Sequence, residues 1–65
     1  MNSNNLKFIR KEKRFTITEL ARRTKLSRVT ITNIENQKVT PRVDTAFKIA
    51  RELDVDVTKI FFEKM

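Results

Sequence analysis

The apolar residues of this chain recur at intervals of three and four, in short groups separated by polar residues. Leu6 and Ile9 lie three positions apart, as do Ile31 and Ile34, and this interval places both side chains of a pair on one face of a helix. The pattern predicts five short helices and no strands. They are expected over residues 6–13, from Thr16 into the polar residues 22–25, over residues 28–35, from about residue 43 to Leu53, and over residues 57–62.

Residues that cap helices stand where this pattern places the helix starts. A capping side chain accepts a hydrogen bond from a backbone N–H that the first turn leaves unpaired. Glu19 lies three residues after Thr16 and completes the sequence of a capping box. Asp44, in the first turn of the fourth helix, suits the positive end of the helix dipole. The expected caps are Asn4 or Asn5, Thr16, Ser27 and Asp56.

Five helices in 65 residues, with loops of a few residues each, fit a compact all-α bundle. We expect a single domain over residues 1–65, because a chain this short has no room for a second core. Phe8 lies off the apolar stripe of its helix, and is either a ring over the edge of the domain or part of a contact between subunits. The expected apolar packing set is Leu6, Ile9, Phe15, Leu20, Ala21, Leu26, Ile31, Ile34, Val43, Ala46, Phe47, Ile49, Ala50, Leu53, Val55, Val57, Ile60 and Phe61.

Residues 16–36 have the pattern of two short helices joined by a tight turn, and the second helix has two different sides. Its two isoleucines face inward. The opposite side carries Arg28, Val29, Thr32 and Asn33. In the major groove Arg can bond guanine, Asn can bond adenine, and the methyl groups of Val and Thr can touch the thymine methyl group. The sequence therefore predicts a helix that reads DNA bases with these four side chains.

The amino-acid composition excludes several kinds of function. Cys and His are both absent, which removes disulfides, thiolate zinc sites, Cys nucleophiles and His acid–base chemistry. We therefore expect no enzyme activity, no metal, no cofactor and no obvious small-molecule ligand. No apolar run approaches the roughly 20 residues that cross a bilayer, and the polar N-terminus lacks the apolar stretch of a signal peptide. A cytoplasmic protein with no membrane partner is the expectation.

The balance of charge points to a polyanionic partner. Lys and Arg total 15 against 8 acidic residues, a net charge of +7 in a small domain. A well-solvated surface is one explanation of this charge. Neutralisation of phosphates is the other, because it supplies most of the non-specific affinity of proteins for nucleic acids. Charge alone does not separate DNA from RNA or from an anionic membrane.

Short fragments over nearly the whole chain, in a fixed order and spacing, resemble the lambda-repressor-like (Cro/C1, Xre-type) helix-turn-helix regulators. Each fragment alone is a weak signal, and the set together is a strong one. The resemblance implies an all-α, five-helix DNA-binding domain with its helix-turn-helix at about residues 16–36. The matching residues are 6–13, Thr16, 19–21, 26–28, Thr30, Ile31, 34–36, Lys38, Pro41, 44–46, Ile49, Ala50 and 53–55.

The resemblance also implies particular residue roles. An Arg at position 10 of this family pairs with the Glu at position 35, so we expect an Arg10–Glu35 ion pair between the first helix and the recognition helix. The family commonly has Gly after each of its first four helices, where a left-handed backbone conformation favours Gly. In this chain those four positions hold Arg14, Lys25, Gln37 and Asp54.

Two departures from the family affect the expected DNA contacts. The first position of the second helix is often Gln and is here Ile17, whose backbone N–H can still face a phosphate. The residue after the recognition-helix Arg is also often Gln and is here Val29, which cannot bond a base edge. Lys38 and Arg42 flank a loop that could also approach a minor groove. The expected phosphate contacts are Thr16, Ile17, Ser27, Thr30, Asn36, Lys38 and Arg42.

The function predicted by these features is sequence-specific binding of double-stranded DNA, most simply by a repressor. One domain offers few base contacts, so we expect a homodimer on a near-palindromic operator. The surface that dimerises stays open, with Phe8, Phe62 and Met65 as candidates and Val39 as a weaker one. The alternative function is a protein-interaction module, such as an antitoxin or accessory factor whose basic face binds an acidic partner.

Overall fold

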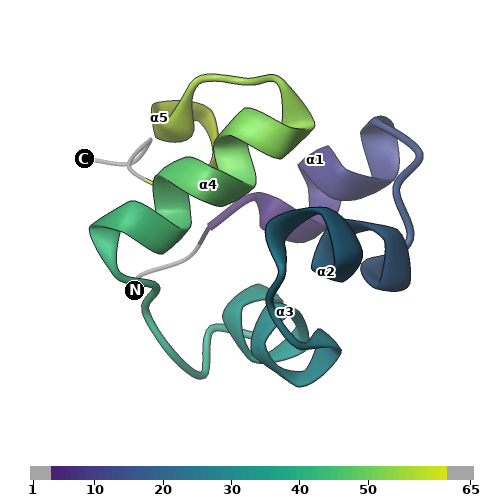
Figure 1. Cartoon of the computed structure of the whole chain (residues 1–65). Coiled ribbons are helices and arrows are strands. Elements are labelled where there is room, and N and C mark those ends of the chain that lie inside the picture. Colours follow the sequence, from purple (N-terminus) through teal and green to yellow (C-terminus); the bar gives the residue numbers. More distant parts are fainter. Residues whose placement is uncertain (1–3, 62–65) are drawn as a thin grey trace.

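The computed structural model describes residues 4–61, which form five helices and no strand. Their order along the chain is α1 (Leu6–Glu12), α2 (Ile17–Thr24), α3 (Arg28–Glu35), α4 (Val43–Leu53) and α5 (Val57–Ile60). In Figure 1, α4 crosses the front of the bundle, with α5 above it and α3 below it. Helix α2 packs against both α3 and α4, α1 packs against α3, and α5 packs against α4. The all-α, five-helix prediction is confirmed.

Side chains cap the helices where the sequence predicted. The Thr16 hydroxyl accepts from the Glu19 N–H at 3.0 Å, and the Ser27 hydroxyl accepts from the Thr30 N–H at 3.0 Å. The Glu19 carboxylate itself accepts from Arg22 and Arg23, so its side chain turns along α2 instead of back to Thr16. The bond from Arg23, and to a smaller extent the bond from Arg22, holds the pKa of Glu19 below its usual value.

The remaining two caps lie at the ends of the described chain. Asn4 Oδ1 accepts from the Leu6 N–H at 3.0 Å, while Asn5 is the residue at the start of α1 and its side chain donates to the Lys59 carbonyl. Asp56 accepts from the backbone N–H and the hydroxyl of Thr58, and these bonds lower the pKa of the Asp56 carboxyl.

A single apolar core joins all five helices. It consists of Leu6, Ile9, Leu20, Ala21, Ile31, Ile34, Ala46, Ile49, Ala50, Leu53, Val57 and Ile60, with Phe15, Ile17, Leu26, Val55 and Phe61 half-buried against it. Two expected members of the packing set are wrong, because Val43 is 64% exposed and Phe47 is 51% exposed. At about 100° per residue, Phe47 points roughly a quarter turn away from the buried Ala46. The buried stripe of α4 is therefore narrower than its apolar pattern.

Thr24 is a core residue that the sequence pattern assigned to a polar helix end. Its side chain is fully buried, and its hydroxyl donates to the Leu20 carbonyl at 2.8 Å. This bond to the preceding turn satisfies the hydroxyl, so the residue can pack inside the domain without an unpaired polar group.

Of the predicted dimer candidates, Phe8 on α1 is 66% exposed and Val39 is 47% exposed. Phe62 and Met65 lie outside the described residues.

All four positions at which the resembling family commonly has Gly are left-handed here. Arg14, Lys25, Gln37 and Asp54 have φ values of 65°, 63°, 63° and 60°. For a residue with a Cβ atom this conformation costs about 1–2 kcal/mol relative to the right-handed one. The turns of this domain therefore keep the family's backbone geometry without the family's usual residue.

Replacing Lys25 by Gly should therefore stabilise the domain. Gly removes the cost of the left-handed conformation, about 1–2 kcal/mol. The greater freedom of Gly in the unfolded chain offsets roughly 0.5–1 kcal/mol of this gain. We expect a net gain of about 0.5–1 kcal/mol, which raises the melting temperature by roughly 2–8 °C. Gln37→Gly is the matched comparison and should gain less, because the Gln37 side chain makes the contacts described below. A lower melting temperature for Lys25→Gly would contradict this account of the turn.

Candidate nucleic-acid interface

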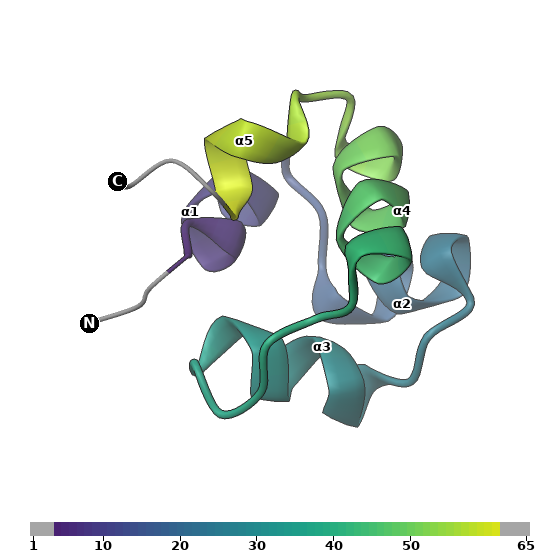
Figure 2. The same ribbon diagram turned by 90° about the vertical axis from the view of Figure 1, so that its left-hand side faces the viewer.

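The outer face of α3 is open to solvent at its start and partly covered further along. Arg28 and Val29 are exposed, Val29 by 67%, while Thr32 and Asn33 are half-buried. Figure 2 shows α3 along the lower edge of the bundle, with the other helices above it. None of the four predicted base-reading side chains is fully buried, and the two at the start of α3 are the most open.

The inner face of α3 is held by buried contacts on two sides. Ile31 and Ile34 are 0% and 1% exposed and pack into the core. Glu35, at the end of the helix, is buried and its Oε2 lies 2.5 Å from Arg10 Nε. Arg10 also donates to the Phe15 carbonyl at 2.8 Å. The ion pair implied by the family resemblance is therefore present, and it ties α3 to α1 and to the turn before α2.

A second set of contacts holds the C-terminal end of α3, and sequence reasoning missed it. Asn4 Nδ2 donates to the Ile34 carbonyl at 3.0 Å and to Gln37 Oε1 at 3.2 Å. Gln37 Nε2 donates to the Glu35 carbonyl at 3.0 Å. The only signal in the sequence was that Gln37 stands where the resembling family commonly has Gly. Its side chain links the start of α1 to the end of the recognition helix.

The predicted phosphate-binding residues lie on the surface around α3, with one exception. Thr16, Ser27, Asn36, Lys38 and Arg42 are exposed. Thr30 is half-buried and its hydroxyl accepts from the Ser27 hydroxyl at 2.9 Å. Ile17 is the exception, since its side chain packs against the core and only its backbone could face a phosphate.

The charge of this region suits a polyanion. Residues 27–43 contain Arg28, Lys38 and Arg42 as cations and Glu35 as their one acid. Because Glu35 is buried against Arg10, no carboxylate of this stretch faces outward. Arg42 Nε approaches Asp44 Oδ1 of α4 only to 3.9 Å, and both side chains are strongly exposed, so this pair is weak.

Among residues 4–61 no three acidic side chains come together as metal ligands. No helix in the described part of the chain is both long and apolar enough to cross a bilayer.

Comparisons with known proteins agree with this geometry. A sequence profile of the helix-turn-helix family matches residues 6–60. The crystal structure of a candidate DNA-binding protein from Bacteroides fragilis superposes with a TM-score of 0.85 and 32% identity, over 92% of this chain and 97% of that one. That of the hypothetical transcription factor NHTF from Neisseria has a TM-score of 0.78 and 25% identity, over 85% of this chain.

The two structures differ in how much of their own length this chain spans. It covers nearly all of the Bacteroides protein but 63% of NHTF. No curated protein matches the sequence closely enough to count as a relative. The family profile extends from the start of α1 to the end of α5, which is the whole bundle described above. The chain therefore belongs to the lambda-repressor-like, Cro/C1-type family of helix-turn-helix DNA-binding transcription regulators.

Proposed function

We propose that this protein is a sequence-specific repressor that binds a near-palindromic operator as a homodimer. The observation that carries the proposal is the outer face of α3, on a helix whose other side is fixed in the core. Arg28 and Val29 are exposed there, and Thr32 and Asn33 are partly exposed. A rigid helix is needed because a base-edge hydrogen bond discriminates only if its donor and acceptor are held in place.

Each of the four side chains has a role in this proposal. Arg28 donates to guanine, Asn33 pairs with adenine, and the methyl groups of Val29 and Thr32 contact thymine. Val29 has no hydrogen-bonding group, so the base beside it is selected by methyl contact and shape. The operator should therefore show a preference for thymine at the position next to the one read by Arg28.

Phosphate contacts set the register of α3 in the major groove. The backbone N–H groups at the starts of α2 and α3 can face phosphates, with Thr16 and Ser27 at those helix starts. Further contacts come from Thr30, Asn36, Lys38 and Arg42, and from the backbone of Ile17. Lys38 and Arg42 lie in the loop after α3, which follows the DNA backbone in this arrangement.

The biological consequence is control by occupancy. Two copies on one operator place their recognition helices one helical turn apart, about 34 Å, on the same side of the duplex. A dimer bound over a promoter excludes RNA polymerase. The protein acts through binding alone, without a cofactor, and works in the cytoplasm, where a bacterium keeps its DNA.

Selection of bound sequences from random duplex DNA tests the proposal. We expect enrichment of one motif with two-fold symmetry, bound about 10³-fold or more above random DNA. The logarithm of the affinity should fall steeply with the logarithm of the salt concentration, because phosphate contacts release counterions. Equal affinity for every duplex would leave only polyanion binding, and a failure to bind duplex DNA would favour the protein-interaction alternative.

A further inference from the structure

The C-terminal end of α3 is closed by backbone and side-chain hydrogen bonds together. The last four carbonyls of an α-helix have no partner inside the helix. After α3, the Lys38 N–H donates to the Asn33 carbonyl at 2.9 Å. The Gln37 N–H donates to the Ile34 carbonyl at 3.1 Å, which completes a Schellman motif with Gln37 as its left-handed residue. The Glu35 carbonyl is met by a side chain, since Gln37 Nε2 donates to it at 3.0 Å.

Both ends of the Gln37 side-chain amide are occupied by bonds inside the domain. Its nitrogen donates to the Glu35 carbonyl, and its oxygen accepts from the Asn4 backbone N–H and from Asn4 Nδ2, both at 3.2 Å. A Gln at the end of a recognition helix could otherwise bond adenine in the major groove. Here the amide joins Asn4 to the end of α3 instead.

Asn4 is itself fixed to the rest of the domain. Its Oδ1 accepts from the Leu6 N–H at 3.0 Å, and the Leu6 side chain is fully buried. The next residue, Asn5, donates through its backbone N–H to the Ile60 carbonyl at 2.9 Å and through its side chain to the Lys59 carbonyl at 3.1 Å. The start of the described chain is therefore tied to α5 as well as to α1, and Asn4 is a fixed partner for the end of α3.

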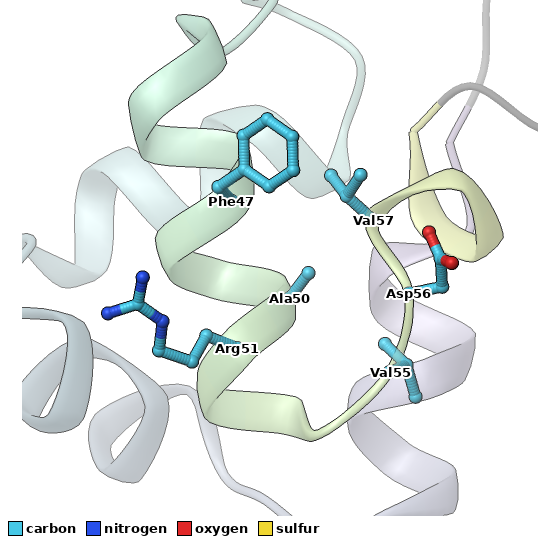
Figure 3. A pocket seen from close by; sticks show the side chains of 6 residues that line it. All are labelled: Phe47, Ala50, Arg51, Val55, Asp56 and Val57. Carbon is cyan, nitrogen blue, oxygen red and sulfur yellow. The ribbon is translucent and has the colours of Figure 1, made fainter.

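Helix α5 is in turn fixed to α4, so the contacts of Asn4 lead back to the core. Val57, at the start of α5, and Ile60, at its end, both belong to the buried core. Figure 3 shows the Phe47 ring of α4 pointing toward Val57 across the groove between these two helices. The end of α3 is therefore held from α1 and α5 through Asn4, in addition to the ion pair with Arg10.

Asn33 is the predicted base-reading residue nearest to this contact. It lies four residues before Gln37, about one helical turn, and its carbonyl is bonded to the N–H of Lys38, a predicted phosphate contact. Arg28 lies at the other end of α3, about 7 Å farther along the helix axis. A shift of the helix end therefore moves the Asn33 amide relative to the phosphate-contacting loop and has little effect on Arg28.

We propose that Gln37, held by Asn4, is a positioning residue for DNA recognition that sets the placement of the Asn33 side chain in the major groove. Gln37 touches no base itself, because its amide is committed to Asn4 and to the Glu35 carbonyl. Gly, which the family commonly has at this position, could not make the contact. This inference rests on the proposed function, in which Asn33 reads adenine.

Two substitutions at position 37 separate positioning from stability. Gln37→Met keeps the length of the side chain and the cost of the left-handed backbone but loses the hydrogen bonds. Gln37→Gly loses the same bonds and relieves that cost, so it should melt at a higher temperature than Gln37→Met. Selection from random duplex DNA measures base preference at each position, and the Asn33→Ala selection identifies the position that Asn33 reads.

Both variants should weaken the preference at the Asn33 position by about fivefold or more, which is the lower end of what a bidentate base contact supplies. The preference at the Arg28 position and the salt slope should be unchanged, because no cation is lost. Asn4→Ala breaks the contact from the other side and should weaken the same position. Lys25→Gly is the matched control, since it relieves the same backbone conformation in the turn before α3 and should leave the whole motif as in the wild type.

An unchanged motif in Gln37→Met overturns the inference. So does a loss of preference that is spread over all positions and follows the melting temperature across the variants, which would assign the contact to stability alone. A loss at a position that Asn33→Ala leaves intact overturns it as well, because Gln37 would then read a base itself. These three outcomes leave the proposed function standing, whereas a wild type that selects no motif removes the proposed function and this inference together.

Discussion

Removing either member of the Arg10–Glu35 pair should destabilise the domain by about 3–5 kcal/mol, because the remaining charge is left buried without its partner. The two side chains are 8% and 4% exposed, so water cannot replace the lost group. A domain of 65 residues has a total stability of only about 3–10 kcal/mol, so either single substitution takes a large share of it. We expect Arg10→Met and Glu35→Leu each to lower the melting temperature by more than about 12 °C.

The double variant Arg10→Met, Glu35→Leu distinguishes the pair from simple loss of packing. Apolar side chains of similar volume can replace a buried ion pair at little cost, so the double variant should be more stable than either single one. Urea unfolding of all four proteins gives the coupling energy, which we expect to be several kcal/mol. Arg22→Met is the matched control, because Arg22 pairs with Glu19 at the surface and its loss should cost about 1 kcal/mol or less. A coupling energy near zero would refute the role given to the pair.

Arg28→Ala and Asn33→Ala should each erase the base preference at one position of each half-operator. The expected cost is about 1–3 kcal/mol per lost contact, or roughly 5-fold to 150-fold in discrimination against the wrong base. Two copies on a symmetric site lose the contact twice. The measurement is a repeat of the sequence selection with each variant, compared position by position with the wild type.

Lys38→Ala is the matched control for these two base-reading variants. Its expected contact is a phosphate, so it should weaken binding to all sequences about equally and reduce the salt slope by about 1, with the motif intact. The opposite result, in which Lys38→Ala changes the motif and Arg28→Ala does not, would move base reading from α3 to the following loop. It would then favour the minor-groove approach considered for Lys38 and Arg42.

Local residue types determined much of this fold. Capping side chains bond to backbone groups only two or three residues away, so Thr16, Ser27 and Asp56 marked the starts of α2, α3 and α5 without knowledge of the rest. The direction of the buried face of α3 also followed from periodicity. Both inferences succeed because they depend on distances within one or two helical turns.

The family resemblance supplied the features that depend on distant residues. The Arg10–Glu35 pair joins residues 25 positions apart, and no rule of spacing within a helix predicts it. The left-handed conformations of Arg14, Lys25, Gln37 and Asp54 contradict the ordinary preference of residues with a Cβ atom. The resemblance pointed to both, because the ion pair depends on a contact between two helices and because these four residue types do not themselves favour a left-handed turn.

By itself the sequence determined the number and approximate limits of the helices, the inward face of α3 and the excess of positive charge. Only the tertiary structure decided that Val43 and Phe47 are exposed, that Thr24 is buried, and that Asn4 binds Gln37. The physical reason is that periodicity gives the direction of an apolar stripe, whereas its buried width depends on how far neighbouring helices cover it. Contacts across 33 residues likewise exist only once the loops have brought the two ends together.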